Sequence, residues 1–431
     1  MKKPFVSLFL MAIVMVNVWG VSDTTQNLNQ SKQVLTLKLA LQKTLSQNPQ
    51  LHQFNFKKDQ LLAHRNFSEL KPAYEFGMEV ENFAGNGETK SFDSTELTVA
   101  LSSAIELGDK QHSRVDVANA HLERFDLERQ AQTLDVLADV TRAFVHVLST
   151  QEELKLASDA VSLSESLYRT VEKRSQQGAV SDWEVMRAKA MLVNSQLQRD
   201  GIQQKLERQK VSLARFWGNT DVTFSKLDGD LYAFGKSLSF SELYDKVSVS
   251  PAMRVFASEI RLKKAEFRLA KSENQANLNW QFGVKRMQDS GDTAFTAGFS
   301  MPLFSESRNS SRVDVALAKR NSVAYQRTEH LMIIHDRLYT AYSQRQQFMN
   351  TYQKLKEKVI PTLEKAHILS RKAYERGRLK YQDWIAAQQE LLSAKKRLIK
   401  SASAALLNQA VIEQLTAEPL TQLSDADIND R

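Results

Sequence analysis

Four glutamates, Glu75, Glu79, Glu81 and Glu96, fall at alternating positions of two neighbouring segments, so that each segment carries them on one face. Carboxylates gathered on one face of an aqueous passage attract cations. The residues alone favour a plainer interpretation, in which any polar side chain serves on a water-filled face. Cation passage is therefore a hypothesis about this face.

Groups that could hold a metal or attack a substrate are absent or scattered in the sequence. The chain has no cysteine, which excludes disulfides, a cysteine nucleophile and thiolate metal sites. No two of the eight histidines have the i, i+4 spacing of a helical metal site. We find neither a nucleophile–base–orienter set nor a phosphate-binding loop. The sequence predicts a non-enzyme with no cofactor and no metal site.

The composition favours long helices. Of 431 residues, 42% are hydrophobic and 25% charged, with a net charge of +8, which excludes a disordered chain. Only 14 glycines and 7 prolines are present, too few for an all-β fold with many tight turns. Acidic and basic residues are interspersed, so we expect no nucleic-acid partner.

The N-terminus has the pattern of a signal peptide. Lys2 and Lys3 precede an apolar run over residues 5–18, which is too short for a spanning helix. We expect cleavage after Gly20 and export of the mature chain.

The sequence repeats itself. Residues 113–118 recur verbatim as residues 311–316, and the pairs Pro49/Pro251 and Gly178/Gly377 keep nearly the same displacement. Collinear landmarks of this kind indicate a tandem duplication. The predicted domains are a signal peptide at 1–20, a first repeat at 33–217, a linker at 218–236, a second repeat at 237–418 and a C-terminal tail at 419–431.

Each repeat contains two segments in which apolar and polar residues alternate, as in strands with one apolar and one polar face. The apolar positions are Tyr74, Phe76, Met78, Val80, Leu97, Val99, Leu101, Ile105, Leu278, Trp280, Phe282, Val284, Phe295, Ala297, Phe299 and Met301. Turn-rich loops at 85–88 and 289–292 separate the segments. The pattern predicts β-hairpins at 73–106 and 277–304.

The remainder of each repeat, at 108–217 and 305–418, is predicted to form coiled-coil helices. Residues 109–177 and 303–360 contain neither glycine nor proline. Leu391, Leu398, Ala405 and Ile412 recur every seven residues, as in a coiled coil. We expect a kink near Ile360, because Pro361 removes a helical hydrogen bond. Each repeat is predicted as helix, hairpin, long helix, glycine-marked turn and long helix.

The two hairpins cannot close a barrel alone. Aromatic apolar faces opposite polar faces suit strands between lipid and a wet lumen. An open sheet edge is prohibitive in a bilayer, so the chain must share its barrel with copies of itself. Two copies would supply about 8 strands and leave a filled interior, whereas three would supply about 12 and a conduit.

These features together resemble the TolC family of outer-membrane efflux channels over residues 33–418. The residues that carry the resemblance are Leu35–Leu37, Asn48–Pro49, and the turn motifs Gly178, Glu184, Ala188 and Gly377, Asp383, Ala387, Gln388. Residues 81–87 and 105–110 resemble the cobalt–zinc–cadmium (heavy-metal RND) efflux branch.

The resemblance implies a mainly helical protomer with a small β part that trimerises. The trimer would form a 12-stranded β-barrel in the outer membrane of a Gram-negative bacterium and a 12-helix α-barrel in the periplasm. Outer-membrane lipid, a periplasmic membrane-fusion adaptor and an inner-membrane RND pump would be its partners, and substrate would pass without catalysis.

The resemblance also implies where function lies. Asp383 and Tyr374 match the periplasmic entrance of the family, and Glu184 and Arg378 fall beside them, whereas a second acidic position is Ala386. Asp383 could instead be an ordinary solvated helix residue, and Glu184 could pair with Arg187 or Lys189. The tips expected to dock the adaptor are Gly178, Ala179, Val180, Ser181, Gly377, Arg378, Leu379 and Lys380.

The leading interpretation is thus an efflux duct for divalent heavy-metal cations. A general drug or type I secretion duct of the same family is one alternative. A periplasmic coiled-coil scaffold without a pore is the other.

Overall fold

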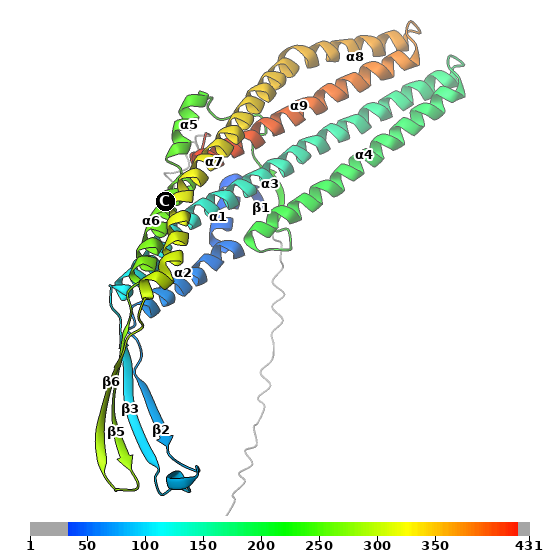
Figure 1. Ribbon diagram of the computed structural model, residues 1–431. Coiled ribbons are helices and arrows are strands. Elements are labelled where there is room, and N and C mark those ends of the chain that lie inside the picture. Colours follow the sequence, from blue (N-terminus) through cyan, green and yellow to red (C-terminus); the bar gives the residue numbers. More distant parts are fainter. Residues whose placement is uncertain (1–32, 421–431) are drawn as a thin grey trace, which may run out of the picture.

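A four-stranded sheet continues directly into long helices in the computed structural model, which describes residues 33–420 (Figure 1). The predicted signal peptide and most of the predicted C-terminal tail lie outside these residues. The protein is mainly helical with a small β part, which confirms the predicted fold class. The first repeat contains β1 (Gln33–Thr36), α1 (Leu37–Gln47), α2 (Pro49–Ser68), β2 (Glu75–Glu81), β3 (Glu96–Ile105), α3 (Lys110–Gln176) and α4 (Asp182–Ala214).

The second half follows the same order of helices, hairpin and helices. It begins after strand β4 (Phe224–Asp228). Its elements are α5 (Phe240–Ser248), α6 (Pro251–Ser272), β5 (Leu278–Met287), β6 (Thr293–Ser300), α7 (Ser305–Lys354), α8 (Ile360–Glu375) and α9 (Tyr381–Thr416). Each half has two helices before its hairpin, where the sequence predicted one. Pro49 and Pro251 each open the second of these helices, a position where a missing N–H costs nothing.

The protomer is one layer, four elements wide at each end. The sheet order is β2-β3-β5-β6, with all three pairings antiparallel. Next to the sheet, α2, α3, α6 and α7 pack in sequence, and at the far end the order is α4, α3, α9 and α8 (Figure 1). The first half therefore forms one edge of the layer and the second half the other.

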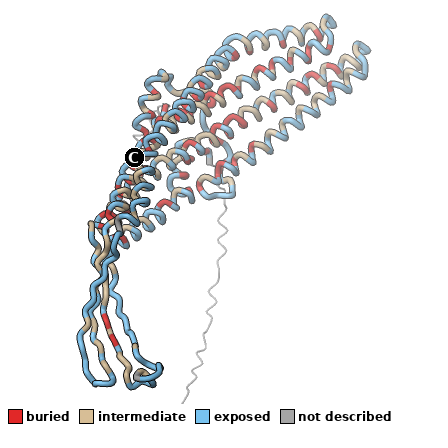
Figure 2. Tube along the Cα trace, viewed as in Figure 1, coloured by how far each residue is buried: buried red, intermediate tan, exposed pale blue. Residues whose placement is uncertain are grey.

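The main hydrophobic cluster lies where the layer is thickest, around the middle of α3. Strands β1 and β4 pair in parallel there, although the sequence predicted no strand in either segment. Leu35, Phe144, Trp217 and Leu227 are buried in this cluster, and Figure 2 shows buried residues concentrated along the helices rather than in the sheet. The Gln151 side chain bonds both backbone groups of Leu227, which fixes β4 against α3.

The second long helix bends as Pro361 predicts, although it is not interrupted. Residues Leu355–Val359 form a π-helical turn between α7 and α8, and the chain changes direction there (Figure 1). Sharp helix kinks are typically found at prolines and at π-bulges, and both are present here.

Candidate functional site

The two helical tips are built by the same backbone motif. Gly178 and Gly377 have φ values of +72° and +71°, in the left-handed region that glycine adopts without strain. At the first tip, the Gly178 and Ala179 amides donate to the carbonyls of Ser175 and Arg174 at 2.8 and 2.9 Å. The Gly377 and Arg378 amides repeat this pattern. This pair of hydrogen bonds at a helix C-terminus is a Schellman motif, which ends α3 and α8.

Tyr374 joins the two tips. It lies in the last turn of α8 with 2% of its surface exposed, and its hydroxyl donates to Glu184 Oε2 on α4 at 3.3 Å. The Arg174 guanidinium lies 4.6 Å from the centre of the Tyr374 ring and bonds the Tyr374 carbonyl. The structure thus brings Tyr374 and Glu184 together and adds Arg174, which the sequence analysis missed.

The charge state of this contact is fixed near neutral pH. Burial, aided by the Glu184 carboxylate, raises the pKa of Tyr374 to about 12. The phenol therefore remains a neutral hydrogen-bond donor, while Glu184 accepts. Glu184 forms no ion pair with Arg187 or Lys189 within residues 33–420. The Arg187 guanidinium instead lies 5.3 Å from the centre of the Trp183 ring.

An aromatic cluster under the tips holds them together. The Tyr374 ring centre lies 5.0 Å from that of Trp384 and 6.3 Å from that of Tyr381. Leu167 and Val171 of α3 pack against the same rings. Within residues 33–420, Trp384 Nε1, Tyr381 Oη and both amide atoms of the buried Gln388 have no hydrogen-bond partner. Such groups lower the stability of a site unless water reaches them.

Asp383 and Arg378 stand apart from this network. Asp383 is exposed in the first turn of α9, where a carboxylate is stabilised by the helix dipole. Arg378 is exposed on the tip loop. Neither side chain forms an ion pair with any residue of the described part of the chain. Their predicted role at an entrance remains a prediction.

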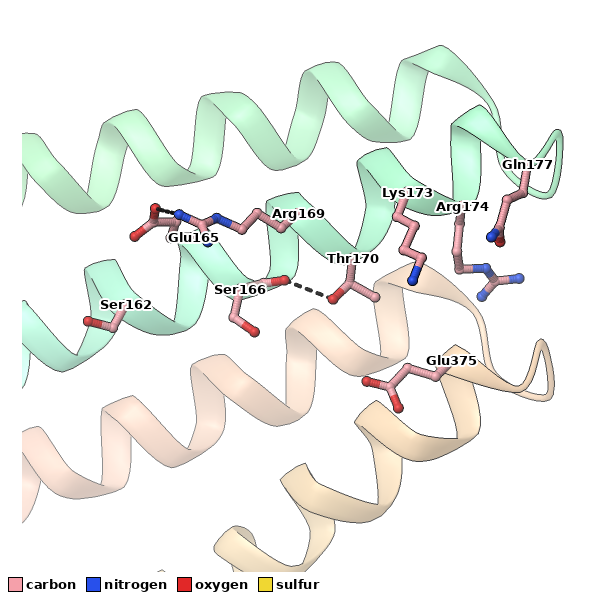
Figure 3. A pocket seen from close by; sticks show the side chains of 9 residues that line it. All are labelled: Ser162, Glu165, Ser166, Arg169, Thr170, Lys173, Arg174, Gln177 and Glu375. Atoms are coloured by element: carbon pink, nitrogen blue, oxygen red, sulfur yellow. Dashed lines mark hydrogen bonds and ion pairs between the residues drawn. The ribbon is translucent and has the colours of Figure 1, made fainter.

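Two hollows flank the tips. The larger, about 650 Å³, lies between α3 and α8 and carries both charge signs (Figure 3). Its lining residues are Ser162, Glu165, Ser166, Arg169, Thr170, Lys173, Arg174, Gln177 and Glu375. The smaller, about 360 Å³, lies between the tip loops. Of the residues predicted to dock an adaptor, Ala179, Val180, Gly377, Leu379 and Lys380 line the smaller hollow.

The sheet separates apolar and polar side chains onto opposite faces. Phe76, Leu101 and Phe282 are register partners across three strands, so they share a face. Phe295 on that face is 90% exposed, whereas Thr98 on the polar face is 6% exposed.

The polar face carries a lysine that the sequence analysis missed. Lys285 Nζ lies 2.8 Å from Glu81 Oε2 and 2.5 Å from Glu96 Oε2. Glu75 and Glu79, the other two predicted lumen residues, form no ion pair within residues 33–420. Lys285 directly follows Val284, at the next polar position of the alternation in β5, so the alternation itself is the signal that identifies it.

The described residues include no cluster of three or more side chains suited to a metal ion. Burial lowers the pKa of His121, His146 and His367, which keeps these imidazoles neutral. Over the same residues, every helix is too polar or too short to cross a bilayer.

Known proteins share both the sequence pattern and the architecture. The outer membrane efflux protein family matches residues 40–219. The cobalt-zinc-cadmium resistance protein CzcC of Cupriavidus metallidurans is 23% identical over 302 residues, covering 70% of this chain and 72% of CzcC.

Solved structures extend the likeness to almost the whole chain. The outer membrane channel CmeC of Campylobacter jejuni has a TM-score of 0.74 at 15% identity, covering 97% of this chain and 96% of CmeC. CusC has a TM-score of 0.73 at 14% identity, covering 88% of this chain and 91% of CusC. The single-layer architecture, the repeated hairpins and these matches agree: the chain has the fold of TolC-like channels, its residues 40–219 match the outer membrane efflux protein family, and these likenesses indicate the outer membrane of a Gram-negative bacterium.

Proposed function

We propose that three copies of this chain close into a conduit with a 12-stranded β-barrel and a 12-helix α-barrel. The observation that carries the proposal is the single layer with two open edges. Strands β2 and β6 each pair on one side only within residues 33–420. An open strand edge is prohibitive in a bilayer, and three copies supply enough strands for a water-filled lumen.

The helical edges support the same closure. In the far section, α4 packs mainly on α3 and α8 mainly on α9, so α4 and α8 form opposite edges. Both expose large apolar side chains, among them Met186 and Leu197 on α4 and Leu369 on α8, each more than 60% exposed. Burial of such surface drives association, and β6, α7 and α8 of one copy would meet β2, α2 and α4 of the next.

The assembled trimer would place the polar sheet face in the lumen and the apolar face in lipid. Its periplasmic end would be the helical tips, where three copies of Asp383 form a carboxylate ring with Glu184, Tyr374 and Arg378 nearby. A carboxylate ring favours cations. The tip loops 178–181 and 377–380 would dock a periplasmic adaptor, and an inner-membrane RND pump would deliver substrate to it.

For the cargo we propose divalent heavy-metal cations. The resemblance of residues 81–87 and 105–110 to the heavy-metal branch supports this, as does the likeness to a cobalt-zinc-cadmium resistance protein. A drug or type I secretion duct is the alternative within the family, and it differs in cargo alone. The scaffold alternative leaves both open edges without a partner.

The test of cargo is a growth challenge. The gene is deleted and the host is exposed to zinc, cobalt, cadmium, nickel, copper and silver salts, and separately to drugs and detergents. We expect hypersensitivity to metals alone, restored by the wild-type gene. Hypersensitivity to organic compounds alone would overturn the metal assignment and favour the drug duct.

The test of the pore itself is separate. We expect the protein in outer-membrane fractions as a detergent-stable complex of three copies, with residues 86 and 289 accessible at the cell surface. A soluble periplasmic monomer would contradict the conduit and favour the scaffold.

A further inference from the structure

Lys285 holds the polar face of the sheet together at one end. It lies on β5, and its partners Glu81 and Glu96 lie on β2 and β3, so its two ion pairs span both seams between the three strands. About a quarter of the Lys285 and Glu96 side-chain surface is exposed, so the pairs contact solvent. This end of the sheet is the one remote from the helices (Figure 1).

The ion pairs divide the charge of the face unevenly. The charged residues on the polar face are four glutamates and Lys285, a net charge of −3 per chain. Lys285 pairs with the two glutamates nearest the far end. Glu75, at the helix-proximal end of β2, forms no ion pair within residues 33–420, and neither does Glu79. The negative charge is thus partly compensated at the outer end, where one ammonium group faces two carboxylates, and uncompensated deeper in.

We propose that Lys285 is a specificity-determining residue of the channel, which keeps the outer mouth from retaining cations. The inference rests on the proposed conduit. A channel conducts when its sites are attractive enough for an ion to enter and weak enough for it to leave. In three copies, the six mouth carboxylates would otherwise form a ring that holds divalent cations. Three ammonium groups weaken that ring, and at physiological salt screening confines their effect to about 8–10 Å.

The test compares Lys285 with the adjacent Arg286, which lies on the opposite face of the sheet. Purified wild-type, Lys285→Gln and Arg286→Gln proteins are recorded in planar bilayers, first in potassium chloride and then with cadmium chloride added on the side of the sheet loops. Both variants lose one positive charge. Arg286 is the matched control because it is opposite Leu97, on the apolar face. We expect cation-over-anion permeability to rise about twofold or more in Lys285→Gln. We also expect cadmium to block that variant from the outer side, with Arg286→Gln behaving as wild type.

Two double variants control for a failure of Lys285→Gln to assemble. Lys285→Gln with Glu81→Gln keeps the wild-type net charge and should return selectivity to the wild-type value. Glu81→Gln with Glu96→Gln, which leaves Lys285 in place, should lower cation selectivity even if Lys285→Gln does not assemble.

The outcomes separate this inference from the conduit. Wild-type protein without conductance would overturn the proposed function. A conducting wild type in which Lys285→Gln, or the Glu81/Glu96 double variant, leaves selectivity and cadmium block unchanged would overturn the role of Lys285 alone.

Discussion

The two ends of the molecule join the same two repeats in different ways. At the sheet end, β3 and β5 are paired over ten registered residue pairs, and Lys285 adds side-chain ion pairs across the seams. At the helical end, the tips meet through side chains. The Tyr374–Glu184 hydrogen bond is 3.3 Å long, and Arg174 and the aromatic cluster supply the remaining contacts.

The difference indicates which junction between the repeats is held more firmly. In the proposed conduit, separating β3 from β5 would expose a row of backbone groups, which is prohibitive in a bilayer. Separating the tips would break a few side-chain contacts. We therefore expect the contacts between the tips to break more easily than the pairing of β3 with β5.

The largest effect is expected from a truncation in the aromatic cluster under the tips. Trp384→Ala removes a side chain that is 1% exposed, and such truncations cost about 3–5 kcal/mol. Hydrogen exchange should show lost protection in α8 and α9 near the tips, with β3 and β5 unchanged. Gln389→Ala, an exposed position on the same helix, is the control and should change little. Equal loss of protection in the sheet would contradict the independence of the two ends.

The next largest effect addresses the sheet end. Phe282→Arg puts a charge on the apolar face, which costs about 2–4 kcal/mol at the middle of a bilayer. Gln281→Arg puts the same charge on the polar face, facing water. The yield of heat-stable trimer in outer-membrane fractions should fall for Phe282→Arg and stay near wild type for Gln281→Arg. Equal yields, or a larger fall for Gln281→Arg, would contradict the assignment of the two faces.

A smaller effect is expected at the contact between the tips. Tyr374→Phe removes the hydroxyl that bonds Glu184 and should cost about 1 kcal/mol locally. The folded-state pKa of Tyr374, about 12, lies above the ordinary value of 10. Its contribution is therefore complete below about pH 10 and is lost as the pH rises towards about 12. Hydrogen exchange across that range should show a pH-dependent loosening of the tips in the wild type that is reduced in Tyr374→Phe.

The smallest effect concerns Asp383, which forms no ion pair within residues 33–420. Asp383→Ala should lower cation selectivity in a planar bilayer by about twofold, because it removes one carboxylate per copy from the proposed ring. Glu390→Ala, which removes an exposed carboxylate farther along α9, should have no effect. Equal selectivity in wild type and Asp383→Ala would exclude Asp383 from the entrance.

The sequence predicted the features that have a local period. Alternation revealed the four strands of the sheet, and the lack of glycine and proline revealed the long helices. Gly178 and Gly377 could be read as helix ends because a left-handed residue there is a local requirement.

Contacts between distant residues had no such signal. Tyr374 and Glu184 are 190 positions apart, and Lys285 and Glu96 are 189 apart. Arg174 and Trp384 gain their surroundings from the packing of one repeat on the other. The parallel pairing of β1 with β4 was missed for the same reason, since both strands are too short for alternation to identify them.

The most direct test of the conduit uses the absence of cysteine from the chain. Asp383→Cys would place three thiols around the proposed threefold axis, and thiolates bind soft metal ions tightly. Single-channel recording should show that wild type and Asp383→Cys both conduct. Micromolar cadmium on the side of the helical tips should block Asp383→Cys alone, and a chelator should reverse the block. Conductance in both proteins without cadmium block of the variant would contradict convergence of α9 on a shared entrance, and no conductance in either would contradict the conduit.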